Sequence, residues 1–207
     1  MKAVFTICIL AIGIISCSEY NRISVPSEQE TQVVQAIGDS ISKILFKTLQ
    51  TKLKKEMQSA GPKSAIKVCS QEALVIADEI AASAAYPMEI KRTTFKNRNP
   101  KNAPDDVEGI ALKYYEDKFT NSEKLPAVYV QKVKEAEGFY YNYYKPMRVG
   151  NICLVCHGNP ELMDPELTGI LSSIYPNDLA VGYKEGDFRG LISIKIKNLD
   201  RTQSNKY

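Results

Sequence analysis

The stretch Cys153-Leu154-Val155-Cys156-His157 constrains this chain more than any other. Two cysteines separated by two residues and followed directly by histidine have the spacing of a c-type haem attachment site. The two thiols can add to the vinyl groups of haem, and the adjacent imidazole can then reach the iron from one side. His157 is the only histidine among the 207 residues, which excludes a second imidazole ligand from this chain. The motif therefore predicts one covalent haem c with His157 as an axial ligand.

Three other interpretations of the motif compete with haem. A redox disulfide between Cys153 and Cys156 would suit a thioredoxin-like chain, but there the motif stands early, after a strand. A zinc site could use Cys69 together with Cys153, Cys156 and His157, although two adjacent ligands would both have to face one metal. A chance match is the third. We favour haem over zinc, and zinc over the disulfide.

The second side of the iron has three candidate arrangements, and the residues alone leave them open. Methionine often partners histidine in c-type cytochromes, and Met88, Met147 and Met163 are available, although core filling is the commoner role of a methionine. Cys69 is a thiol without an evident disulfide partner in an exported chain, which asks for an explanation. The third possibility is that no protein ligand binds there.

The N-terminus predicts export and lipid anchoring. Residues 1–16 combine Lys2 with an apolar run that is too short for a membrane span. The run ends in Ile14-Ile15-Ser16-Cys17, which resembles the lipobox of bacterial lipoproteins and implies cleavage before Cys17 and acylation of its thiol. An ordinary secretory signal and an uncleaved anchor are the alternatives. We expect the mature protein in the bacterial cell envelope, facing the periplasm and attached to a membrane by lipid, which is where haem attachment takes place.

Hydrophobic periodicity predicts an α+β protein. Helical patterns cover about 32–58, 64–84, 108–119 and 165–173, and strand patterns cover about 88–95, 126–134, 138–145 and 190–197. In the second helix, Cys69 shares one apolar stripe with Ile66 and Ala73, so we expect it on the buried face. We divide the chain into a signal peptide (1–16), a tether (17–31), a haem-binding domain (32–200) and a tail (201–207).

Several separated motifs resemble one known family. They are the stretches 65–69 (AIKVC), 92–104 (RTTFKNRNPKNAP), 153–158 (CLVCHG), 175–178 (YPND) with 182–183 (GY), and 186–190 (GDFRG). In this order they are similar to the c-type haem, PAS-like family catalogued as a domain of unknown function. The resemblance covers about residues 35–198. It implies an antiparallel PAS-like sheet with flanking helices, and axial ligation of the haem iron by His157 and a distant cysteine, here Cys69.

The basic residues near these motifs are candidates for pairing with the haem propionates, which are anions. They are Arg98, Arg92, Lys96 and Arg148, and we favour Arg98 because Pro100 stiffens its loop. Tyr141 and Tyr143 are weaker candidates for lining the pocket, because they also read as one face of a sheet. A net charge of +3 is too small to argue for a nucleic-acid partner.

The expected function is a redox or small-ligand sensing or accessory role, with a periplasmic electron-transfer cytochrome as the alternative. The resembled family occurs ahead of bacterial signalling output domains, and this sequence has no room for one, which argues against direct signalling. A redox or signalling partner protein is expected instead. Two strong axial ligands leave no iron position for a substrate, so we expect no enzyme, although a peroxidase-like activity at an opened haem stays a third possibility.

Overall fold

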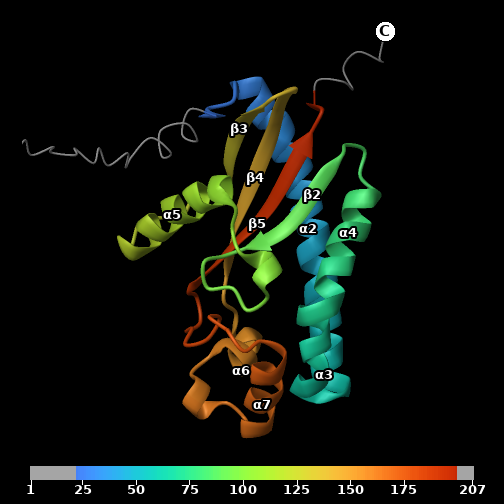
Figure 1. The fold of residues 1–207 in the computed structure, drawn as a ribbon, viewed down its shortest axis with the longest axis vertical. Coiled ribbons are helices and arrows are strands. Elements are labelled where there is room, and N and C mark those ends of the chain that lie inside the picture. The colour runs from blue at the N-terminus through green and yellow to red at the C-terminus, as the bar shows by residue number, and fades with distance from the viewer. Residues whose placement is uncertain (1–21, 200–207) are drawn as a thin grey trace, which may run out of the picture.

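The computed structural model describes residues 22–199, which form one antiparallel sheet with helices on both faces (Figure 1). The strands are β1 (Ile23–Ser24), β2 (Met88–Thr93), β3 (Tyr129–Glu135), β4 (Gly138–Arg148) and β5 (Phe188–Lys197). Their order across the sheet is β1-β3-β4-β5-β2, and every neighbouring pair is antiparallel. The predicted α+β class, with an antiparallel sheet, flanking helices and a long N-terminal helix, is confirmed.

The long helix α2 (Glu28–Ser59) starts earlier than expected. Ser27 and Glu30 form a capping box, in which each side chain accepts from the other residue's backbone N–H and satisfies two donors of the first turn. Upstream, Ile23 and Ser24 pair with β3. The folded domain therefore includes residues 22–31, which were expected to belong to the tether.

Helix α2 packs on one face of β4 and β5, where Gly38 lets it come close. A Cβ built on Gly38 would lie 2.2 Å from the ring of Tyr143. The Tyr143 hydroxyl donates to Asp39 Oδ1 at 2.6 Å, and the Tyr141 hydroxyl donates to Glu30. Both tyrosines thus lie in the core beneath α2, which agrees with the sheet-face interpretation rather than with a place in the haem pocket.

The opposite face of the sheet is covered by α5 (Asp106–Thr120). Tyr115 of α5 packs with Tyr144, Phe188 and Leu191, whose side chains leave the sheet on the side away from α2. Glu108 is 5% exposed and accepts from Lys91 Nζ at 2.7 Å. This face forms a second core that does not reach the haem motif.

The segment expected as one helix over 64–84 is divided in three. It forms α3 (Gly61–Lys67), a π-helical turn (Val68–Glu72) and α4 (Ala73–Ala82). A π turn holds more residues than an α turn, so it shifts the phase of the side chains around it. Val68 is 2% exposed and takes the core position, whereas Cys69 is exposed. The prediction that Cys69 lies on the buried face was wrong, because the α-helical period does not hold through this turn.

The haem motif lies beyond one end of the sheet, beside α3 (Figure 1). A 3₁₀ turn (Asn151–Cys153) leads into the short helix α6 (Leu154–His157), and α7 (Pro165–Ile174) follows. Ile66 of α3 packs with Leu167 and Leu171 of α7, and Cys156 joins this cluster. The motif therefore forms a helical turn after Gly150, and Cys156 on this turn contacts the helix that precedes Cys69.

Three predicted segments lie outside the described residues: the signal peptide over 1–16, the lipid-bearing Cys17 and the tail beyond residue 200. Within residues 22–199, no helix is long and apolar enough to cross a membrane.

Candidate haem site

Helix α6 is ended by a glycine that the local backbone requires. The Gly158 N–H donates to the Leu154 carbonyl at 2.8 Å, and a Cβ on Gly158 would lie 2.6 Å from that same oxygen. The next loop closes over the turn through two further bonds, from Gly182 N to Gly158 O at 2.8 Å and from Tyr183 N to His157 O at 3.0 Å. The motif is therefore fixed by main-chain contacts on both sides of the histidine.

His157 is held as a neutral imidazole with a defined tautomer. Its Nδ1 lies 2.7 Å from the Ala180 carbonyl oxygen, and since a carbonyl can only accept, Nδ1 carries the proton. Burial lowers the pKa of His157 to about 3, and the positive charges of Arg98 and Arg189 act in the same direction. Nε2 is thus unprotonated at neutral pH, which is the form that binds a metal ion.

Three cysteines near His157 are free thiols: Cys153 and Cys156 on its own turn, and Cys69 from the π-helical turn. They are close enough that negative charge on Cys69 or Cys153 disfavours ionisation of Cys156. The exposed Cys69 thiol is reached by water, yet burial raises its pKa because many protein atoms surround it. Nearby Arg92, with weaker help from the other arginines, opposes this rise and favours the thiolate.

The competing uses of the motif gain no support from the geometry. Across residues 22–199, no three or more His, Cys, Asp and Glu side chains are grouped so that they could hold a metal ion. The zinc site proposed from Cys69, Cys153, Cys156 and His157 is therefore not formed. Cys153 and Cys156 are free thiols rather than a disulfide.

The methionines divide by position. Met88 and Met147 pack against the core under α2. Met163 packs beside Cys156 and also lines a pocket of ≈ 540 Å³ along α6, together with Leu154, Val155 and Tyr183. None of the four predicted haem residues lines this pocket. Among the three methionine candidates, the structure brings only Met163 near the motif.

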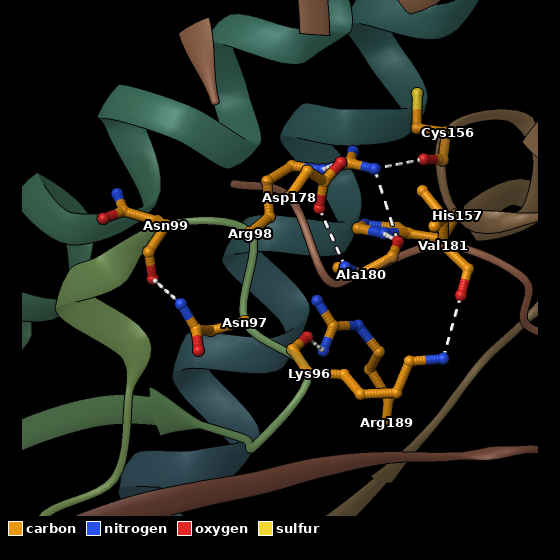
Figure 2. A network of polar contacts seen from close by, with 10 residues as sticks. All are labelled: Lys96, Asn97, Arg98, Asn99, Cys156, His157, Asp178, Ala180, Val181 and Arg189. Carbon is orange, nitrogen blue, oxygen red and sulfur yellow. Dashed lines mark hydrogen bonds and ion pairs between the residues drawn. The ribbon is translucent and has the colours of Figure 1, made fainter. Parts of the chain in front are cut away.

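Arg98 joins three segments around the motif (Figure 2). Its Nε forms an ion pair with Asp178 Oδ2 at 2.8 Å, and the two side chains are 11% and 14% exposed. Its Nη2 donates to the main-chain carbonyls of Cys156 and Ala180. The Ala180 carbonyl is also the one that orients His157. Arg98 therefore links the loop that carries this acceptor to the turn that carries Cys156.

The other basic candidates lie in two places. Lys96 Nζ donates to the Val181 carbonyl at 2.9 Å and lies 4.3 Å from the Tyr183 ring centroid. Arg92 Nη2 donates to the Cys69 carbonyl at 3.4 Å. Arg148 is exposed, and it contacts the Gly186 carbonyl at 2.7 Å and the ring of Phe119 on α5. Arg92, Lys96 and Arg98 therefore lie around the motif, whereas Arg148 lies toward α5; propionate binding by any of them stays a prediction.

Arg189 also lies at the site, although it is not among the basic candidates expected from the sequence. This residue donates to the Lys96 carbonyl at 3.1 Å, lies 5.2 Å from the Tyr183 ring centroid, and its charge acts on both Cys69 and His157. It precedes Gly190, whose φ is +130° and whose Cβ would lie 2.4 Å from the Thr93 carbonyl oxygen. Only glycine permits this approach of β5 to β2. The sequence offered one signal for Arg189: it is a charged residue directly before a glycine, within the 186–190 stretch that resembles the family.

Comparisons with known proteins identify the family. The family model described as Tll0287-like matches residues 21–197. Among solved structures, the chain is similar to the cyanobacterial haem protein Tll0287, at 24% sequence identity and a TM-score of 0.56, over 83% of this chain and 96% of that one. No curated protein matches significantly. The structural likeness shows a shared fold, and the family match shows that this chain belongs to the Tll0287-like family, as its separated motifs predicted.

Proposed function

We propose that this member of the Tll0287-like family binds one haem c covalently through Cys153 and Cys156, with His157 and Cys69 as the axial ligands of the iron. The observation that carries the proposal is the state of His157. Its Nδ1–H is fixed by the Ala180 carbonyl, its ring is neutral, and its Nε2 is free to bind, directly after two free thiols at the attachment spacing. The solved relative is a haem protein, which supports the same cofactor.

The donor set suits the group. Cys69 supplies a third thiol near Cys153, and three arginines around it favour a thiolate. A thiolate is a strong donor that stabilises ferric iron, and a bound cation lowers the pKa of its ligand thiol. The haem would supply a one-electron redox centre. The chain itself orients the imidazole and supplies the thiolate.

With both axial positions taken by protein, the proposed role is redox or small-ligand sensing, or an accessory function, without catalysis. Electron transfer in the periplasm is the second role, because a six-coordinate haem also suits it. The two roles require different reduction potentials of the haem, since a thiolate-ligated haem of very low reduction potential would be a poor electron carrier. A redox titration of the purified protein therefore separates them.

Covalent attachment is tested by denaturing the protein and extracting it with acidified organic solvent. Haem should stay with the polypeptide and account for one equivalent. The double variant Cys153→Ala/Cys156→Ala should release its haem in the same treatment. Haem that leaves the wild-type chain, or a stoichiometric zinc ion in its place, overturns the proposal.

The axial pair is tested by EPR of the ferric protein. Wild type should be low-spin, and Cys69→Ala should shift it toward high-spin, raise the reduction potential and allow cyanide to bind. Met163→Leu is the matched control, because Met163 packs beside Cys156 and should leave the spectrum unchanged. The opposite pattern would assign the ligand to methionine and favour the electron carrier.

The envelope location rests on residues outside the described range. We propose that Cys17 carries a lipid and holds the domain on the periplasmic side of a membrane. Cys17→Ala should release a soluble protein or leave an uncleaved precursor. An unchanged membrane fraction with an unchanged mature mass would contradict the anchor.

A further inference from the structure

The three arginines around the motif are not equivalent. The charge of Arg98 is paired with that of Asp178. Among the arginines within residues 22–199, only Arg98 forms an ion pair. Arg92 and Arg189 donate to main-chain carbonyls, those of Cys69 and Lys96, and have no carboxylate partner in the described part of the chain. Two guanidinium groups beside the candidate haem site thus keep their charge uncompensated.

Both unpaired arginines are partly withdrawn from water. Each is of intermediate exposure, and burial lowers the pKa of Arg189. The positive charge of Arg92 acts in the same direction on the pKa of Arg189, so the two guanidinium groups lie close enough to repel. Holding two repelling, partly desolvated cations without an anion is unfavourable, and an anion placed between them removes the cost.

The two arginines also flank the proposed axial pair. Arg92 contacts the main chain of Cys69 on one side. Arg189 is hydrogen-bonded to Tyr183, whose ring stands edge-on to His157 with the centroids 6.4 Å apart. Their charges act on the Cys69 thiol and on the His157 imidazole. A dianion that reached both arginines would therefore belong to a ligand lying between Cys69 and His157.

We propose that Arg92 and Arg189 together form a site for two carboxylates, which binds the two propionates of the haem. Arg98 has a structural role instead, through its contacts with Asp178, Cys156 and Ala180. This rests on the proposed haem function and assigns the cofactor's acidic edge to residues of β2 and β5. Guanidinium groups suit the task because they bind carboxylates through two parallel N–H bonds. Lys96 is left out because it is exposed and its ammonium already bonds to the Val181 carbonyl.

The test compares haem with its dimethyl ester, which lacks the two negative charges. The full chain carrying Cys153→Ala/Cys156→Ala binds added haem without thioether bonds, so both compounds can be titrated into it. The free acid should bind roughly ten- to a hundredfold more tightly than the ester, as expected for charge-assisted hydrogen bonds. Adding Arg92→Gln or Arg189→Gln should reduce this ratio, and the double change should abolish it.

Arg148→Gln is the matched control, since Arg148 is an exposed arginine turned toward Phe119. It should preserve the ratio, and circular dichroism should show that every variant is folded. A ratio that survives Arg92→Gln/Arg189→Gln, or one that Arg148→Gln removes, overturns the paired site. If the cysteine double variant binds neither compound and the wild-type protein carries no covalent haem, the haem function itself is contradicted.

A second measurement uses the covalently loaded protein. Removing positive charge near the iron favours the ferric state, so Arg92→Gln and Arg189→Gln should each lower the reduction potential, whereas Arg148→Gln should leave it unchanged. Potentials that do not respond to either change would overturn the inference even if the titration could not be completed.

Discussion

The sheet beneath α2 and the loops around the haem motif hold their important side chains by different means. Under α2, Tyr141 and Tyr143 are packed among aliphatic side chains and their hydroxyls donate to Glu30 and Asp39, so side chain meets side chain. Around the motif, the acceptors are main-chain carbonyls: Ala180 for His157, and Cys156 and Ala180 for Arg98. The first region is stabilised mainly by burial, and the second by a few directed polar contacts.

The largest difference should appear in acid. Although burial opposes ionisation, hydrogen bonds from Lys132 and Tyr141 lower the pKa of Glu30 to about 2, and Lys145 and Tyr143 lower that of Asp39. Folded values below the unfolded ones mean that these carboxylates stabilise the protein fully above about pH 4.5, a contribution lost as the pH falls toward 2. The protection factors of the α2 amides, taken relative to the intrinsic exchange rate at each pH, should fall through this range. Glu30→Gln/Asp39→Asn should flatten that dependence, and an unchanged profile in this variant would contradict the assignment.

Removal of Arg98 should damage the motif region and spare the sheet. Arg98→Ala leaves Asp178 as a partly buried charge without its partner and two carbonyls without a donor, which costs about 3 kcal/mol. We expect faster amide exchange in α6 and the 178–183 loop, with little change in β4. Arg148→Ala, at an exposed position, is the control and should be close to neutral. Equal loss of protection in α6 and β4 would mean that the two regions unfold as one.

Added bulk at Gly38 should damage the sheet side. Gly38→Ala places a methyl group against the Tyr143 ring, where only 2.2 Å is available, and should destabilise by about 2 kcal/mol through overpacking. Gly169→Ala in α7 is the matched control, because its Cβ meets nothing within 4 Å and alanine favours the helix. Chemical denaturation should show opposite signs for the two changes, and equal signs would contradict the close approach.

The smallest expected effect concerns one hydroxyl. Tyr143→Phe keeps the ring but removes the bond to Asp39, and should cost about 1 kcal/mol. Because Tyr143 lies under α2 and away from the motif, the ferric spectrum should not change. A spectral shift in Tyr143→Phe would show that the sheet core and the haem site are coupled more tightly than their separate contacts indicate.

Sequence reasoning performed best where one period governs an element. The strand around Ile192, Ile194 and Ile196 follows from simple alternation, and the matching strand is β5. It failed where local geometry departs from the period. The start of α2 was misplaced although Ser27 and Glu30 show the capping-box spacing, and the π turn at Val68–Glu72 leaves no mark that a fixed 3.6-residue period detects.

The site was predictable to a similar degree. Cys153, Cys156 and His157 are specified by their spacing in the sequence, and the structure has them on consecutive helical turns. Arg189 was missed, and Arg148 lies toward α5 rather than around the motif, because nearness to the motif along the chain is a poor guide to nearness in space. β5 brings Arg189 beside Lys96, whereas Arg148 turns toward α5. Tertiary pairing of distant strands decides such cases, and no local pattern encodes it.

The bond from His157 to the Ala180 carbonyl has a consequence for how this protein can evolve. Every amino acid carries a main-chain carbonyl, so no point substitution at position 180 deletes the acceptor. The basicity of His157 therefore depends on the main-chain conformation of this loop, and substitutions of Ala180 should leave it unchanged. Lineages could retune it only by insertions or deletions between about Tyr175 and Asp187, or through the Arg98–Asp178 pair that fixes the loop. Variation in the length of this loop among relatives should therefore track variation in their redox properties.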